Sequence, residues 1–438
     1  MAIRPRNEAV IPKGFPRGGG SGHWLLAFWV VGLLALVSGC ASVVRNPVPE
    51  SVHNRVTVLG RDDFRHWGDC AQCTVFQGIR SVEEIERRYG GIMDQEHNYL
   101  VISGGGANGA YGAGALKAWS ELESRPEFTI VTGVSTGALT APFAFLGSDY
   151  DATLQDVYTT LDTTQLIDTR SAFSLFGADS VVDTTPLSRL IGKVVDEDMI
   201  ERIAAEHRRG RVLAVATTNM DAGRPVVWNL TRIAASGHPD SAKLIRQVML
   251  ASASIPGAFP PVYIEVETPD GLKYDEMHGD GGVSSQMFFY PAGLNWEYVK
   301  RTLRIEGEPT LYVIRNAYIH AQYETIAPRL VPIVSRTISS LIRTQGIGDF
   351  FRIASLAERD GLDMKITWIP DGAQEAIGIA ATEAFDPEYM RALFQFGYRR
   401  TLQGDTWQDF SDMLNAVHMR RQSDGRAFSP EELQYIQQ

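Results

Sequence analysis

From residue 99 onward, continuous apolar runs and stretches with helical spacing of apolar residues follow one another along the chain. Residues 99–103 (YLVIS) form a nearly uninterrupted apolar run, which is typical of a strand buried on both faces. Residues 110–123 place apolar side chains at near-helical spacing, and residues 128–132 predict a second buried strand. Two parallel strands joined by a helix form a right-handed crossover, so the pattern predicts a mostly parallel sheet with helices on both faces.

Later segments continue this pattern. Residues 262–274 predict a hairpin around Asp270 and Gly271, and a helix over 386–402 begins with an Asp-Pro-Glu cap. The remaining predicted strands are 211–218, 225–230, 310–315 and 364–369, and the remaining long helices are 241–252 and 328–358.

Residues 1–39 have the composition of an export signal, with basic residues before an apolar stretch at 24–37 that is short for a spanning helix. The sequence VSGC at 37–40 resembles the lipobox of bacterial lipoproteins, which implies cleavage before Cys40 and diacylation of its thiol. Ala41 at the next position then implies anchoring in the outer membrane of the cell envelope. An uncleaved anchor and an ordinary signal peptide are the alternatives.

Residues 40–96 are polar and predict a tether and lead-in segment with a short helix over 81–89. Cys70 and Cys73 have C-x-x-C spacing, but no second pair is present for zinc and no histidine follows for haem attachment. In an exported protein this spacing predicts a small disulfide loop, with free thiols as the alternative.

Composition excludes one class of function. The hydrophobic content of 44% in 438 residues is sufficient for a large buried core. The formal net charge is -11 and the body of the chain has no long basic run, which argues against binding of nucleic acid.

A candidate nucleophile follows the second strand, where Gly133, Ser135 and Gly137 form the pattern Gly-x-Ser-x-Gly. At a strand-to-helix turn this pattern is typical of a nucleophile elbow. The turn strains the backbone of the serine, and its two glycines allow the neighbouring segments to approach closely. The pattern therefore predicts that the hydroxyl of Ser135 is presented at the end of a sheet.

A glycine-rich loop follows the first strand, with the sequence Gly104, Gly105, Gly106, Ala107, Asn108 and Gly109. Backbone N–H groups at a strand-to-helix turn are suited to bind a developing oxyanion. The same residues also satisfy the dinucleotide fingerprint G-x-G-x-x-G, which makes a nucleotide-binding protein an alternative. The acidic residue that this fingerprint requires about 20 positions on is missing, which argues against that alternative.

Two kinds of base could accept the proton of Ser135. Asp280 lies between Gly279 and the pair Gly281 and Gly282, a context that is also typical of a simple turn. In a Ser-His-Asp hydrolase, the histidine could instead be His278, His320 or His418.

Four blocks together resemble the patatin-like phospholipases: the loop 104–109, the elbow 133–137, the sequence ASASIP at 251–256, and the Asp-Gly-Gly of 280–282. This resemblance implies a three-layer α/β/α sandwich with a mostly parallel sheet, and hydrolysis of acyl ester lipids by a Ser-Asp dyad. It further implies that no histidine, metal or cofactor takes part. Carried over by motif, Ser135 is the nucleophile, Asp280 is the base, and the loop 104–109 forms the oxyanion hole.

The resemblance places a catalytic domain at 97–295 and a C-terminal α/β extension of the same domain at 296–438. Many members have arginine or lysine where this chain has Asn108, which removes a positive charge beside the oxyanion hole. A preference for anionic phospholipid head groups is therefore in question. A catalytically silent envelope scaffold on the same fold is a further alternative.

Overall fold

The computed structural model describes residues 45–71, 73, 81–160, 168–169, 182–256, 258–321, 323–382 and 385–415. Within these residues a ten-stranded sheet has the order β1-β7-β6-β3-β2-β10-β11-β12, and β9 joins it by pairing with both β6 and β8. The strands are β1 (Arg65–Trp67), β2 (Glu96–Ile102), β3 (Ile130–Val134), β6 (Val212–Asn219), β7 (Arg224–Asn229), β8 (Val262–Glu267), β9 (Lys273–Asp280), β10 (Glu306–Tyr318), β11 (Asp363–Ile369) and β12 (Gln408–Asp409).

The centre of this sheet is parallel. Strands β6, β3, β2, β10 and β11 pair in parallel, whereas β1, β7, β8, β9 and β12 add antiparallel pairings at its margins. Two-residue strands β4 (Asp168–Thr169) and β5 (Val182–Asp183) pair separately. The prediction of a mostly parallel sheet is confirmed.

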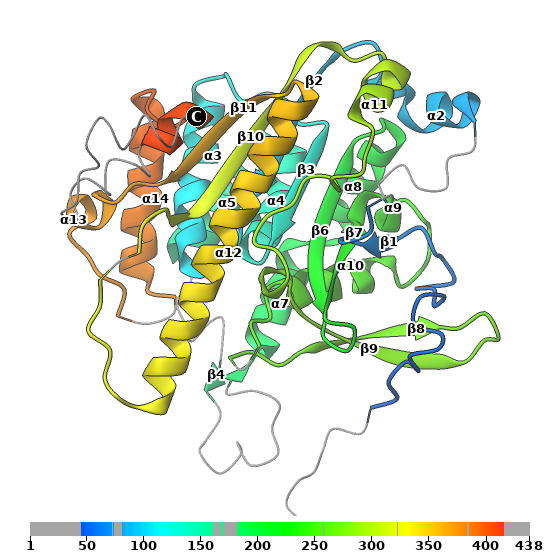
Figure 1. The fold of residues 1–438 in the computed structure, drawn as a ribbon, viewed down its shortest axis with the longest axis horizontal. Helices are drawn as coiled ribbons and strands as arrows, with labels where there is room; N and C mark the ends of the chain where they lie inside the picture. The colour runs from blue at the N-terminus through cyan, green and yellow to red at the C-terminus, as the bar shows by residue number, and fades with distance from the viewer. Residues whose placement is uncertain are drawn as a thin grey trace, which may run out of the picture. The chain divides into compact units, whose positions relative to one another are not determined.

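Helices cover both faces of the sheet, which gives three layers (Figure 1). Successive side chains of β2 point to opposite faces of the sheet. Leu100 and Ile102 pack on one face, and Tyr99 and Val101 pack on the other. The first face carries α3 (Gly109–Glu121), α4 (Thr136–Leu146), α5 (Asp151–Thr160), α7 (Thr185–Val194), α8 (Glu197–Arg208), α9 (Leu230–Ala234), α10 (Ser241–Ser252) and α14 (Pro387–Leu402). The second carries α2 (Val82–Tyr89), α11 (Trp296–Leu303) and α12 (Leu330–Asp360).

Shorter helical turns complete the described chain: η1 (Gly90–Ile92), η2 (Gly106–Asn108), η3 (Ser148–Tyr150), η4 (Gly281–Val283) and α13 (Ala373–Ile377). Figure 1 shows α12 lying across the sheet beside β10. Among the described helices, α12 included, none is long and apolar enough to span a bilayer.

The predicted lead-in segment takes part in the fold from residue 45 onward. Its strand β1 pairs antiparallel with β7, and Val58 and Phe64 are buried in the core. The predicted C-terminal extension supplies β10 and β11, which stand beside β2 in the parallel part of the sheet.

Strand β6 brings together two segments that are far apart in the sequence. Its first half pairs in parallel with β3, up to the pair Val134 and Ala216. Its second half pairs antiparallel with β9, beginning at Thr217 and Asp280. The end of β3 and the end of β9 therefore meet along one edge of β6, immediately before Ser135 and at Asp280.

Candidate active site

Ser135 lies in the turn between β3 and α4, with a φ of 55° that is unusual for a residue other than glycine. The glycine two residues later is required by the close approach of the neighbouring strand β2. A Cβ atom on Gly137 would lie 2.3 Å from the carbonyl oxygen of Ile102. The sharp turn expected of a nucleophile elbow is therefore present, and it directs Ser135 away from the strand.

Asp280 is the hydrogen-bond partner of Ser135. Ser135 Oγ donates to Asp280 Oδ2 at 2.7 Å, and the N–H of Gly282 donates to Oδ1 at 2.6 Å. The carboxyl group is buried, and this burial raises its pKa to about 6, although the hydrogen bonds from Ser135 and Gly282 act in the opposite direction. At neutral pH most of Asp280 is consequently ionised and able to accept a proton.

Two further hydroxyl groups hold this pair in place. Ser252 Oγ accepts a hydrogen bond from the N–H of Ser135 at 3.0 Å and donates to the carbonyl of Ala216 at 2.7 Å. Thr218 Oγ1 donates to the backbone carbonyl of Asp280 at 2.9 Å. Neither side chain was predicted to have a role, although Ser252 lies within the ASASIP block.

The glycine loop lies beside Ser135, and its N–H groups are not equivalent. Those of Gly104, Asn108 and Gly109 donate to backbone carbonyls. In the described part of the chain, the N–H groups of Gly105 and Gly106 have no acceptor, and both glycines line the same cavity as Ser135. These two N–H groups are the ones available to an oxyanion.

Neither of the two described candidate histidines, His278 and His320, takes part in the hydrogen bond of Ser135. His278 is buried with Nδ1 2.9 Å from Thr217 Oγ1 and Nε2 3.0 Å from Glu276 Oε2, and burial lowers its pKa. His320 lines the cavity, and its Nδ1 lies against the carboxylate of Asp371. His418 lies outside the described residues.

Ser135 lies between two hollows. The larger is a cavity of about 630 Å³ that also contacts Asp280 and the glycine loop. The smaller, of about 70 Å³, is lined mostly by apolar side chains of α4, α5, α7 and α14 and of the segments that follow α10 and precede α14. Gly106 and Ile255 line both, so an extended molecule with an apolar end could pass Ser135.

The electrostatics of the larger cavity differ from the expectation based on Asn108. Asn108 Oδ1 accepts a hydrogen bond from the hydroxyl of Tyr389 at 2.7 Å and carries no charge. Positive charge comes instead from Arg315, at the end of β10, and from Arg343 on α12. No sequence motif marks either arginine as a functional residue.

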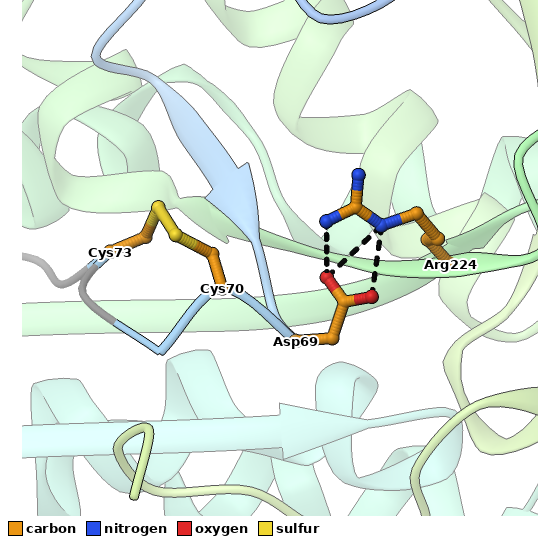
Figure 2. The surroundings of a disulfide bond; sticks show 4 residues. All are labelled: Asp69, Cys70, Cys73 and Arg224. Carbon is orange, nitrogen blue, oxygen red and sulfur yellow. Dashed lines mark hydrogen bonds and ion pairs between the residues drawn. A yellow bond between two sulfur atoms is a disulfide. The ribbon is translucent and has the colours of Figure 1, made fainter. Parts of the chain in front are cut away.

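The C-x-x-C cysteines form a disulfide after β1 (Figure 2). The preceding Asp69 accepts hydrogen bonds from the guanidinium of Arg224, the first residue of β7. Cys40 lies outside the described residues, and those residues contain no group of three or more histidine, cysteine or acidic side chains arranged to hold a metal.

A family model matches the central part of the chain. Residues 100–292 match the family described as patatin-like phospholipase. The chain also shows weak similarity to VipD from Legionella pneumophila, with 16% identity over 72% of this chain and 68% of that chain and a TM-score of 0.37. No curated protein matches the sequence.

Two other solved structures show weaker similarity. Human GIVD cytosolic phospholipase A2 is 10% identical, with 81% of this chain and 65% of that chain covered and a TM-score of 0.35. The type III effector ExoU of Pseudomonas aeruginosa is 13% identical, with 90% and 68% covered and a TM-score of 0.28.

Proposed function

We propose that the protein hydrolyses acyl ester lipids with Ser135 as nucleophile and Asp280 as general base. The observation that carries this proposal is the 2.7 Å hydrogen bond from Ser135 Oγ to Asp280 Oδ2, at the wall of a cavity that also contacts the glycine loop. A nucleophile, a base within reach and free N–H donors are the groups that acyl transfer requires.

In the first half of the reaction, Ser135 Oγ attacks the ester carbonyl carbon while its proton passes to Asp280 Oδ2. The carbonyl oxygen becomes an oxyanion, to which the N–H groups of Gly105 and Gly106 donate. Collapse of this intermediate breaks the bond to the alkoxy group, which takes the proton from Asp280 and leaves as an alcohol.

In the second half, a water molecule attacks the acyl-enzyme and transfers its proton to Asp280. The fatty acid leaves, and the proton returns to Ser135 Oγ. The apolar hollow lined by Leu139, Leu187 and Leu190 is suited to the acyl chain, because burial of each methylene contributes about 0.8 kcal/mol to binding.

We also propose that the protein acts at the cell envelope, anchored in the outer membrane by acyl chains on Cys40. The basis is the lipobox-like sequence VSGC and the Ala41 that follows it. Two or more chains exceed the marginal affinity of a single chain and would keep the enzyme beside its lipid substrate.

Hydrolysis of a nitrophenyl butyrate ester by the wild type and by Ser135→Ala tests the proposed chemistry. We expect the substitution to remove nearly all activity, because no other group can form the acyl-enzyme. Ser148→Ala, at an exposed position after α4, is the matched control and should keep wild-type activity. A correctly folded wild type without esterase or lipase activity would instead support the silent scaffold.

A further inference from the structure

Arg315 is a buried cation that forms no ion pair with any residue in the described ranges. Its side chain is only 1% exposed at the end of β10. Buried arginines are normally paired with a carboxylate, because an unpaired buried charge destabilises the fold. In the described part of the chain, Arg315 Nε has no hydrogen-bond partner, and Nη2 makes only long contacts of 3.4 and 3.5 Å to the carbonyls of Tyr318 and Arg343.

The carboxylate whose charge acts on Arg315 is Asp349, and it already accepts hydrogen bonds from other groups. Asp349 accepts hydrogen bonds from the N–H of Gln286 at 2.6 Å, from Ser285 Oγ at 3.1 Å and from Arg352 at 3.0 Å. Arg352 balances the charge of Asp349 at Oδ1, and the two neutral donors occupy Oδ2. Arg315 therefore keeps unused hydrogen-bonding capacity.

The helix above Arg315 is shaped to admit its side chain. A Cβ atom on Gly346 of α12 would lie 2.8 Å from Arg315 Nη1, so the glycine leaves the space that the guanidinium fills. Burial, together with the positive charge of Arg343, lowers the pKa of Arg315 to about 10. The side chain thus remains charged at neutral pH beside a second cation.

Both arginines line the cavity that contains Ser135. Besides His320 and Tyr318, the ionisable residues among its described lining are Arg315, Arg336, Arg343 and Asp280. Arg336 has Glu324 as an ion-pair partner at 3.6 Å, whereas Arg343 forms no ion pair with any described residue. A locally positive cavity in a chain of net charge -11 indicates an anionic ligand.

We propose that Arg315, together with Arg343, binds the phosphate of a glycerophospholipid head group while the acyl ester of the same lipid lies at Ser135. This inference rests on the proposed hydrolase function and specifies its substrate. Guanidinium groups are suited to phosphate because their donors match its oxygens in a planar fork. Arg315 would supply the charge that Asn108 does not.

The test compares two short-chain substrates that differ in the phosphate, dihexanoyl phosphatidylglycerol and dihexanoylglycerol. We expect Arg315→Gln to lower kcat/KM for the phospholipid roughly 10- to 100-fold, the effect of losing hydrogen bonds to a charged group. The value for the diacylglycerol should change less than about threefold. Arg315→Lys should recover part of the loss, and Arg202→Gln, which removes an exposed charge on α8, should change neither value.

Thermal unfolding separates recognition from a structural role. Because the substitution removes an unpaired buried charge, Arg315→Gln should unfold at the wild-type temperature or above it. If that variant does not fold, Arg343→Gln at a half-buried position tests the same selectivity and should show a smaller loss in the same direction.

Equal loss on both substrates, or no loss on either, would overturn the proposal. Stabilisation of the wild type by inorganic phosphate, with unchanged lipid selectivity in Arg315→Gln, would assign the site to a free anion and would also overturn it. Failure of this inference is distinct from failure of the proposed function, because Ser135→Ala must abolish hydrolysis of both lipids whether or not Arg315 selects between them.

Discussion

Replacement of Asp280 by asparagine is expected to remove activity and, at the same time, to stabilise the protein at neutral pH. The asparagine keeps the size of the side chain and the acceptor for the N–H of Gly282. It cannot take the proton of Ser135, so turnover should fall by roughly 10²–10⁴-fold, the usual contribution of a general base.

The expected stabilisation follows from burial of the carboxyl group. Its pKa is about 6 in the folded protein and ordinarily 3.8. Since a pKa difference of one corresponds to about 1.36 kcal/mol, ionisation of Asp280 costs about 3 kcal/mol more in the folded state than in the unfolded chain. The folded-state pKa is the higher one. The stability of the wild type that comes from keeping Asp280 protonated is therefore fully present below about pH 4 and is lost as the pH rises through about 6. Asp280→Asn should therefore raise the free energy of unfolding by up to about 3 kcal/mol at pH 8 and by much less at pH 4.

The same pKa governs the activity of the wild type. Because only the ionised carboxylate accepts the proton, kcat/KM for a nitrophenyl ester should rise as the pH passes through about 6 and then reach a plateau. Chemical denaturation at pH 4 and pH 8 measures the stability of the wild type and of Asp280→Asn. His278→Gln is the control, and a folded sample should keep its activity within about tenfold of the wild type.

Two results would refute this reasoning. One is an Asp280→Asn variant that keeps more than a tenth of the wild-type kcat. The other is an inactive His278→Gln variant that is folded, since His278 makes its hydrogen bonds to Thr217 and Glu276 rather than to Ser135.

Three further predictions concern the elbow, the disulfide and the anchor. Gly137→Ala should destabilise the protein by roughly 1–3 kcal/mol and lower its activity, because the added Cβ meets the carbonyl of Ile102; an unchanged Tm would contradict this. Replacing Cys70 and Cys73 by serine should cost at most about 2 kcal/mol, since the disulfide closes a very short loop, and should leave activity unchanged; a reductant titration of the wild type followed by Tm checks it. Cys40→Ser should move the protein from the membrane to the soluble fraction, and mass spectrometry that finds no acyl chain on wild-type Cys40 would disprove the lipoprotein assignment.

Much of the fold could be predicted because its strands are buried on both faces. A nearly continuous apolar run, such as residues 99–103, is unambiguous when no face is exposed to water. Edge strands lack this signal. Strand β1 has three residues, two of them Arg65 and His66, and only its pairing with β7 makes it a strand.

The candidate site was predictable where glycines mark it, and not elsewhere. The Gly-x-Ser-x-Gly pattern pointed to Ser135, because Gly137 is needed for close backbone approach, whereas Asp280 was preferred to the candidate histidines through the family resemblance that its Asp-Gly-Gly block helps to carry. Arg315 ends an apolar strand and resembles any basic residue at a strand terminus. Its burial depends on α12, which is distant in the sequence, so no local pattern could have shown that it lacks a counter-ion.

The pairing of β6 with both β3 and β9 has a consequence for how such enzymes can diversify. Successive pairs on a single strand, Ala216 with Val134 and Thr217 with Asp280, set the separation of nucleophile and base. That separation depends on the rise of about 3.3 Å per residue within β6 and not on the length of any connection. Insertions between α4 and β6 would enlarge or reshape the smaller hollow, and insertions between β7 and β8 would reshape both, without moving the two reacting side chains relative to each other. Substrate range can therefore change through loop length alone, while the chemistry stays fixed.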